Sequence, residues 1–157
     1  MSAQKPTDTA GVAIPPPLIY LAGLIVAFGL DWVWPVALLP NPHQYIAGAL
    51  MIGAGMLIVV LVFRRFRAAG TNIEPHKPTT AIVTDGLFAY SRNPVYLALA
   101  CITLGIGAAV DNIWVLVMLV PTLVIVRTAV IAREERYLEG KFGDDYWRYK
   151  MIVRRWI

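Results

Sequence analysis

Four long apolar runs divide the chain, and polar segments separate them. The runs are Leu18–Leu39, Tyr45–Phe63, Val95–Val110 and Ile113–Ala132, and the only charges inside them are Asp31 and Arg127. A helix needs about 20 apolar residues to cross a bilayer. Three runs have that length, and the third acquires it if residues 90–94 add a capped first turn. The pattern predicts an all-α membrane protein with four transmembrane helices over these runs, the third beginning at Pro94.

The segments between the runs differ in length and polarity. Asp111 and Asn112 alone separate the last two runs, so these helices should form a tight antiparallel hairpin. A long polar loop, 64–92, joins the second run to the third, and residues 1–16 form a Pro-rich lead that we expect to be disordered. A charged tail, 133–157, follows the fourth run. One integral-membrane domain over 1–157 accounts for the whole pattern.

The tail carries a helical stripe of its own. Leu138, Phe142 and Tyr146 recur every four residues, which is typical of an amphipathic helix that rests on a membrane surface. Gly143 should break that helix, and Asp144 is placed to cap a second, shorter one. We therefore expect an amphipathic helical tail.

Composition supports the membrane assignment. Hydrophobic residues make up 58% of the chain and charged residues 15%, against roughly 45–50% and about 25% in soluble proteins. In a soluble protein the net charge of +4 would suggest nucleic acid. Beside these apolar runs it favours a membrane with anionic lipid on one side, and we expect no nucleic acid partner. The one cysteine, Cys101, excludes an intrachain disulfide framework and a cysteine-rich metal site, and we expect no metal.

Basic residues predict the side of the membrane on which each segment lies. All 14 Lys and Arg lie in the lead, the long loop or the tail, except Arg127 near the end of the fourth run. The positive-inside rule places those three segments together in the cytoplasm. The sequence thus predicts a multi-pass protein of the inner (cytoplasmic) membrane with both termini and any active site on the cytoplasmic side. The first run is too long for a cleaved signal peptide, so we expect it to remain as a helix.

The two charges inside the runs each allow two interpretations. Asp31 could bind a substrate or a proton, as intramembrane carboxylates often do, or it could lie near the outer surface beside Trp32 and Trp34. Arg127 and Glu134 are seven residues apart and so should share a helix face. They could be a snorkelling arginine with a surface partner, or they could line a polar pocket in the cytoplasmic half of the bundle.

Polar residues just before the third run indicate where its helix begins. Pro94 suits the first turn, because proline needs no hydrogen-bond acceptor there and its φ is already helical. Ser91 and Asn93 can cap the free N–H groups of that turn. These residue types alone predict a helix start.

The same position is also a candidate ligand site. A helix N-terminus attracts anions, and Arg92 adds a full positive charge. Glu134 and Glu135 leave the fourth run at the same level, because the hairpin sets the start of one helix beside the end of the other. We expect a ligand there that carries an anionic group together with cationic or hydroxyl groups.

Two segments resemble a known family. They are "TDGLFAYSRNPVYL" (84–97) and "EERYLEGKFGDDYWRYKMIVRRW" (134–156). Together they resemble the isoprenylcysteine carboxyl methyltransferase family and, more broadly, the small membrane methyltransferases that include phospholipid N-methyltransferases. The resemblance covers 76–157. It implies S-adenosylmethionine as methyl donor, held between the start of the third helix and the tail. The acceptor would be lipophilic, either an isoprenylcysteine-like carboxylate or a phospholipid amine.

The resemblance also implies which residues hold the cofactor. One wall would be Arg92, Asn93, Pro94, Tyr96 and Leu97, the other would be Glu134, Glu135, Leu138, Phe142, Tyr146 and Tyr149, and His76 of the loop would lie near them. In the reaction, Glu135 would accept a proton from an amine acceptor. A carboxylate acceptor would instead be positioned by a cation such as Arg155 or Arg127.

Three positions depart from the family's pattern. Asn93 stands where the eukaryotic enzymes have His, Ala98 where Gly is usual, and Arg154 where Pro is usual, which leaves Arg155 as the matching arginine. These departures bear on the acceptor more than on the cofactor. Two other functions stay open, namely a small four-span transporter that uses Asp31 as its coupling carboxylate, and a non-catalytic membrane scaffold.

Overall fold

The described part of the chain is helical throughout. A computed structural model describes residues 9–38, 42–71 and 79–157. The α-helices are α1 (Pro16–Val33), α2 (His43–Ala68), α3 (Pro94–Ala109), α4 (Ile113–Ile125), α5 (Ala132–Phe142) and α6 (Asp144–Ile152). A 3-10 turn, η1 (Gly86–Ala89), precedes α3, and a π-helical turn, η2 (Val126–Ile131), joins α4 to α5. No strand occurs in these residues, so the all-α prediction is confirmed.

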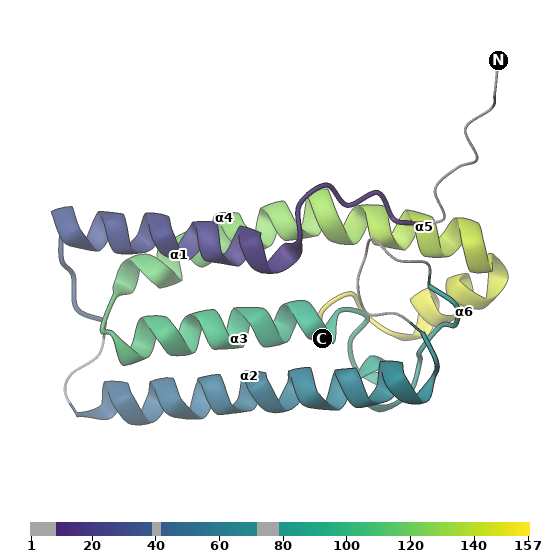
Figure 1. Ribbon diagram of the computed structural model, residues 1–157, viewed down its shortest axis with the longest axis horizontal. Coiled ribbons are helices and arrows are strands. Elements are labelled where there is room, and N and C mark those ends of the chain that lie inside the picture. The colour runs from purple at the N-terminus through teal and green to yellow at the C-terminus, as the bar shows by residue number, and fades with distance from the viewer. Residues whose placement is uncertain (1–8, 39–41, 72–78) are drawn as a thin grey trace, which may run out of the picture.

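The long helices lie side by side. Figure 1 shows α3 between α2 and the layer formed by α1, α4 and α5, with α6 folded back from the end of α5. Helix α3 packs on α2 and on α4, and α1 packs mainly on α4. We call the end that holds residues 84–94 and 132–157 the tail end. The opposite end, which holds residues 31–38 and 109–114, is the hairpin end.

Three helices are long and apolar enough to cross a membrane. They are α1, α2 and the continuous helix Ile113–Phe142, while α3 is apolar but shorter. These helices support a multi-pass membrane protein; the count of four spans and the cytoplasmic side of the termini stay predictions. The apolar part of the continuous helix is 113–131, since α5 brings in charged residues at 133–136. We therefore treat α5 and α6 as lying beyond the membrane-spanning segments.

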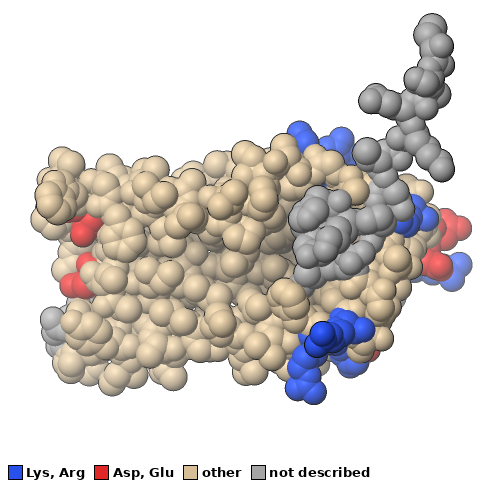
Figure 2. Space-filling view, in the orientation of Figure 1, with Lys and Arg blue, Asp and Glu red and all other residues tan. Residues whose placement is uncertain are grey.

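Charged side chains divide between the two ends. On the face seen in Figure 2, Lys and Arg gather over the tail end, and only Asp and Glu mark the hairpin end. The hairpin end carries Asp31 and Asp111 but no Lys or Arg in its sequence. This separation is the one that the positive-inside rule requires of a spanning bundle.

Proline decides where the first helix ends. The predicted run continues to Leu39, but α1 ends at Val33 because Pro35 disfavours a helical conformation at Trp34, whose φ is −141° and ψ 80°. Asp31 therefore lies in the last turn of α1, next to Trp32, which is 92% exposed. This position favours the surface interpretation of Asp31 over a carboxylate at mid-membrane.

The tail confirms one predicted signal and corrects another. Gly143 separates α5 from α6 at a φ of 54°, as expected of a helix-breaking glycine. Asp144, however, is the first residue of α6 and not its N-cap. Gly143 occupies the cap position, and no side chain caps the helix. Glycine is favoured there because its φ is positive.

Small residues let α2 and α3 approach closely. A Cβ added to Gly48 would lie 2.6 Å from the Cβ of Ala109, and one added to Gly55 would lie 2.8 Å from the carbonyl oxygen of Ala98. Neither glycine can gain a side chain unless the helices move. These contacts hold the first half of α2 closely against α3.

Candidate functional site

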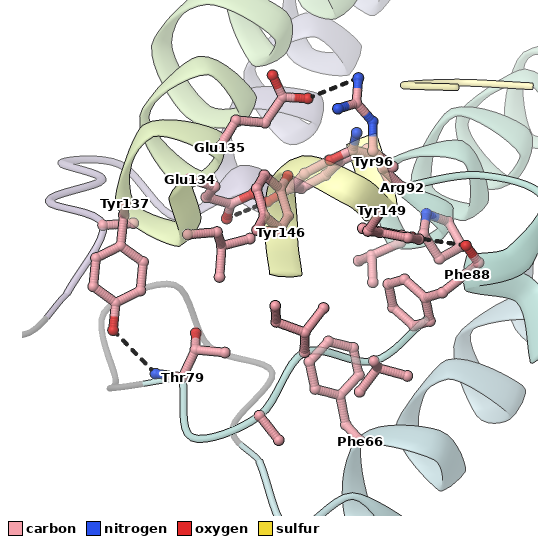
Figure 3. A pocket seen from close by; sticks show the side chains of 18 residues that line it. Phe66, Thr79, Phe88, Arg92, Tyr96, Glu134, Glu135, Tyr137, Tyr146 and Tyr149 are labelled. Atoms are coloured by element: carbon pink, nitrogen blue, oxygen red, sulfur yellow. Dashed lines mark hydrogen bonds and ion pairs between the residues drawn. The ribbon is translucent and has the colours of Figure 1, made fainter. Parts of the chain in front are cut away.

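A cavity lies at the tail end, where the start of α3 meets α5 and α6. Its lining comes from the end of α2, η1, residues 79–83, the start of α3, α5, α6 and Ala10 of the lead. Figure 3 shows the side chains converging on this space from several directions. The lead reaches it because Arg133 donates a hydrogen bond to the carbonyl oxygen of Gly11, at 2.9 Å.

The segment before α3 is bound to the last residues of the chain. The main-chain N–H of Arg92 donates to the carbonyl oxygen of Arg154, at 3.1 Å. The side chains of Asn93 and Ser91 both donate to the carbonyl oxygen of Arg155, at 2.9 Å and 3.4 Å. These bonds fix the start of α3 against a segment about sixty residues further along the chain.

The prediction that Asn93 caps α3 through its side chain is wrong. Asn93 occupies the N-cap position, but its side chain makes no cap hydrogen bond. The physical reason is orientation, because the bond from Nδ2 of Asn93 to the carbonyl oxygen of Arg155 directs the side chain toward the end of the chain, and its Oδ1 does not accept from the first turn of α3. The hydroxyl of Ser91 accepts from the main-chain N–H of Asn93, at 3.1 Å. Ser91 thus provides an acceptor for the N-cap residue and not for the first turn of the helix.

Glu135 is held by two arginines. Arg155 donates to it with two nitrogens, Nε to Oε1 at 3.0 Å and Nη2 to Oε2 at 2.5 Å. Nη2 of Arg92 lies 3.3 Å from Oε1, and both side chains of this second pair are less than a tenth exposed. The hydrogen bond to Glu135 raises the pKa of Arg155. Both oxygens of the buried Glu135 carboxylate are therefore held by guanidinium groups, which form the strong charge-assisted class of hydrogen bond.

Arg92 has more donors than Glu135 uses. Its Nε and Nη1 are buried and have no hydrogen-bond partner among the described residues, and Arg92 lines the cavity. Leaving a buried charged donor unpaired costs more than the roughly 1–3 kcal/mol of an unpaired neutral group. A structure that keeps such donors beside a cavity is suited to an anionic ligand.

Glu134 lies beside Glu135 in the sequence but in a different environment. Its Oε1 accepts from the hydroxyl of Tyr96, at 2.7 Å, and it pairs with no cation in the described part of the chain. Tyr96 in turn accepts at its main-chain oxygen from the hydroxyl of Tyr20, at 2.9 Å. Burial raises the pKa of Glu134 above the usual value for a glutamate.

Aromatic rings line much of the remaining cavity. Phe66 and Phe88 meet edge to face at 5.3 Å, and Tyr146 and Tyr149 do the same at 6.0 Å. The hydroxyl of Tyr149 donates to the carbonyl oxygen of Phe88, at 2.7 Å. Burial raises the pKa of both Tyr146 and Tyr149, so the two phenols stay neutral. The wall is thus flat, apolar and uncharged, which suits a planar ring.

The π-helical turn separates Arg127 from Glu134. In a regular α-helix residues seven apart share a face, but η2 covers Val126–Ile131 and its wider turn rotates the residues that follow. Arg127 is exposed, whereas Glu134 lines the cavity. The predicted shared face is therefore wrong, because the sequence pattern assumed an uninterrupted α-helix.

Most of the predicted site residues meet at the cavity. Those that line it are Arg92, Asn93, Pro94, Tyr96, Glu134, Glu135, Leu138, Tyr146 and Tyr149. Leu97, Phe142 and Arg155 are not among its lining residues, although Arg155 contacts Glu135 directly. His76 lies outside the described residues. The roles assigned to all of them stay predictions.

Several lining residues were not predicted. Phe66, Phe88 and Tyr137 contribute rings, and Ile82 and Val83 contribute aliphatic walls. Phe66 follows Val62 by one helical turn and so belongs to the buried face of α2, but in the sequence it is hidden between arginines. The arginines at 64, 65 and 67 interrupt the apolar pattern there, so the sequence alone does not reveal this face.

The described residues hold no cluster of three or more His, Cys, Asp or Glu side chains that could bind a metal ion. The expectation of a metal-free site remains a prediction. The polar groups that the cavity offers are instead a guanidinium with free donors, two carboxylates and several phenols.

Comparisons with known proteins find a matching family and one short relative. A family model described as "Phospholipid methyltransferase" matches residues 43–145, which is more than half of the chain. An uncharacterized protein of Haemophilus influenzae is 41% identical over 63 residues, which are 40% of this chain and the whole of that protein. No solved structure matches the chain.

Proposed function

The chain belongs to the phospholipid methyltransferase family, and on that premise we propose that it moves a methyl group from S-adenosylmethionine to a lipophilic acceptor at the tail-end cavity. The family is one of membrane methyltransferases, and the apolar helices agree with that assignment. The observation that carries the proposal is the pair of buried Arg92 donors, Nε and Nη1, which lie beside the cavity and have no partner among the described residues.

The donor set of the cavity fits the groups of this cofactor. The free N–H groups of Arg92 suit the amino-acid carboxylate, because a charge-assisted bond to a carboxylate is among the strongest in proteins. Glu134, which has no cation partner in the described chain, suits the ammonium or the ribose hydroxyls. The rings of Phe66, Phe88 and Tyr149 offer an apolar wall for adenine.

The bound cofactor would supply an electrophilic methyl group on a sulfonium. The chain's own task is then alignment in a site that excludes water, which can lower a barrier by roughly 7–11 kcal/mol. The hydrogen bonds from Arg92, Asn93 and Ser91 to the chain's last residues provide the rigidity that alignment needs. A lipophilic acceptor could enter from the bilayer between the apolar helices.

Glu135 and Arg155, which the sequence suggested as catalytic groups, have a different role in this proposal. Each is a partner of the other, and Glu135 also contacts Arg92. We propose that the pair holds the Arg92 guanidinium in place, with its free nitrogens directed to the cofactor carboxylate. Their effect on methyl transfer would then come through cofactor binding.

A transporter that uses Asp31 has less support. Such a role needs a carboxylate near mid-membrane, whereas Asp31 lies in the last turn of α1 at the hairpin end. The cavity lies at the tail end, which is the opposite end of the bundle (Figure 1). A change of Asp31 to Asn should accordingly leave ligand binding at the cavity unchanged.

Calorimetry of the detergent-purified protein with S-adenosylhomocysteine, the demethylated product, tests the proposal. We expect saturable binding with one site per chain. Binding that is absent at millimolar ligand would leave the scaffold interpretation in its place. Transfer of a labelled methyl group from S-adenosylmethionine to extracted membrane lipid would then show whether the bound protein is an enzyme.

A further inference from the structure

A second hollow lies at the tail end, on the other side of η1 from the cavity. Its lining comes from the last turns of α2 and from residues 86–90, and we call it the arginine hollow. Leu87 of η1 lines this hollow, whereas the next residue, Phe88, lines the cavity. The two spaces share no lining residue. An inference about the arginine hollow is therefore independent of the proposed methyl transfer.

The charge of the arginine hollow is positive. Among the described residues that line it, only Arg64 and Arg65 are charged. Nη2 of Arg65 lies 3.2 Å from Oδ2 of Asp85, and a Cβ added to Gly86 would lie 3.0 Å from its Nε, so the Arg65 side chain is held beside η1. Arg64 is exposed and pairs with no acid in the described part of the chain. Two guanidinium groups and one carboxylate leave one positive charge without a counter-charge.

Apolar surface continues from these arginines along α2. Leu57 and Leu61 lie on the same helix face as Arg64 and Arg65, one and two turns earlier, and their side chains are 58% and 38% exposed. Tyr90 borders the hollow on its other side with a side chain that is 76% exposed, and tyrosine is favoured where a membrane meets water. Because α2 is apolar enough to cross a membrane, the cations lie where its lipid-facing surface ends.

From this arrangement we propose that the arginine hollow binds an anionic phospholipid, with the lipid phosphate on Arg64 and Arg65 and an acyl chain along Leu57 and Leu61. Guanidinium groups bind phosphate oxygens through paired N–H donors, and basic pockets beside membrane helices are suited to anionic headgroups. The inference goes beyond the proposed function, since this lipid is held outside the cavity and is not the methyl acceptor.

The local charges favour a lipid with a single negative charge. One positive charge without a counter-charge matches a phosphodiester whose headgroup is otherwise neutral, as in phosphatidylglycerol. A zwitterionic lipid brings an ammonium group as well, and Asp85, the acid beside the hollow, is already paired with Arg65. A soluble phosphate would have no use for the apolar surface at Leu57 and Leu61.

Native mass spectrometry of the detergent-purified full chain counts bound lipids and gives their affinities. The probes are dioleoyl phosphatidylglycerol, dioleoyl phosphatidylcholine and glycerophosphoglycerol, which is the first headgroup without acyl chains. Arg64→Gln removes one cation from the hollow. Arg67→Gln is the matched control, because it removes the same charge from an exposed arginine three residues further on that does not line the hollow. Unfolding midpoints without lipid verify that both variants are folded.

We expect one phosphatidylglycerol per chain, bound about fivefold or more tightly than phosphatidylcholine, which is the effect of roughly one basic residue on an anionic lipid. Arg64→Gln should weaken phosphatidylglycerol binding by about the same factor, and Arg67→Gln by less than about twofold, because salt screens a charge outside the site. Asp85→Asn should instead strengthen binding, since it releases Arg65 from its partner.

Each of three results would overturn the inference. Equal affinity for the two lipids would show that the hollow does not select a negative charge. Equal losses for Arg64→Gln and Arg67→Gln would mean that a diffuse basic surface attracts the lipid. Glycerophosphoglycerol that competes as strongly as the lipid would assign the hollow to a soluble phosphate. Binding of S-adenosylhomocysteine concerns the cavity alone, so its absence would leave this inference standing.

Discussion

Two of the apolar helices begin with an asparagine, and the two asparagines have different roles. At the hairpin end, Asn112 caps α4, since its Oδ1 accepts from the main-chain N–H of Trp114, at 2.8 Å. At the tail end, Asn93 occupies the same position before α3 but donates to the carbonyl oxygen of Arg155 and leaves the helix without a side-chain cap.

The surroundings of the two helix starts also differ, since one is closed by hydrogen bonds and the other lies beside a cavity. The hairpin end is closed by hydrogen bonds between its two connections, from the N–H of Leu38 to Asp111 at 2.7 Å and from the indole of Trp114 to the carbonyl oxygen of Trp34 at 2.7 Å. The tail end connects the start of α3 to residues near the end of the chain, and beside its cavity two donors of Arg92 have no partner in the part of the chain that the structure describes. One end is organised for stability, and the other has the features of a binding site.

The largest effect should come from removing the carboxylate at the tail end. Glu135→Ala leaves Arg92 and Arg155 without their buried partner, and breaking such a pair typically costs about 3–5 kcal/mol. We expect a large fall in the thermal unfolding midpoint in detergent. Glu139→Ala is the matched control on the same helix, because its ion pair with Lys150 is about a third exposed and such pairs contribute roughly 0–1 kcal/mol. Equal losses for the two variants would mean that burial of the Glu135 cluster is not what matters.

The next effect concerns the close contact between α2 and α3. Gly48→Ala would place a Cβ 2.7 Å from the carbonyl oxygen of Gly105, and overpacking of this kind costs about 1–3 kcal/mol. Gly53→Ala is the control, since nothing lies within 4 Å of its added Cβ and alanine in a helix interior gains roughly 0.5–1 kcal/mol. Unfolding midpoints of the two variants should move in opposite directions. A Gly48→Ala protein as stable as the wild type would show that α2 and α3 are not in such close contact.

Features of the fold and the site that depend on nearby residues could be predicted from the sequence, and those that depend on distant residues could not. The apolar runs, the break at Gly143 and the meeting of the α3 start with Glu134 and Glu135 follow from run lengths and from the short Asp111–Asn112 turn. The role of Asn93 was not readable, because it depends on a carbonyl group more than sixty residues away. The π-helical turn has no sequence signal that we used, and its rotation decided where Glu134 points.

Serine substitutions sharpen the comparison of the two asparagines. Asn112→Ala should lose roughly 0.5–2 kcal/mol of stability, and Asn112→Ser should recover most of it, because serine also caps helices. At position 93 serine should rescue nothing, since what is lost there is the amide N–H that binds the carbonyl oxygen of Arg155. Thermal midpoints and S-adenosylhomocysteine affinity measured together decide the matter. A serine that rescues Asn93 as well would mean that both residues are simple caps.

The smallest effect is the pH dependence of stability that Glu134 brings. Since burial raises the folded-state pKa of Glu134, its contribution is fully present below the ordinary pKa of a glutamate and is lost as the pH rises through the raised value. Glu134→Gln should therefore be the more stable protein at alkaline pH, with the difference closing in acid. Unfolding midpoints across a pH series, without ligand, provide the check. A variant that is less stable than the wild type at every pH would contradict the assignment of a half-buried carboxylate that pairs with no cation in the described part of the chain.

The most direct test of the central claim compares two ligands on two proteins. S-adenosylhomocysteine carries the amino-acid group with its carboxylate, and 5′-methylthioadenosine lacks it. If the unpaired donors of Arg92 bind that carboxylate, calorimetry should show the wild type binding S-adenosylhomocysteine about 10–100-fold more tightly, as expected for hydrogen bonds to a charged group. In Arg92→Met this preference should shrink strongly, whereas in Arg154→Ala, at an exposed neighbouring arginine, it should persist. Equal affinity of the wild type for the two ligands, or a preference that Arg92→Met retains in full, would contradict the account.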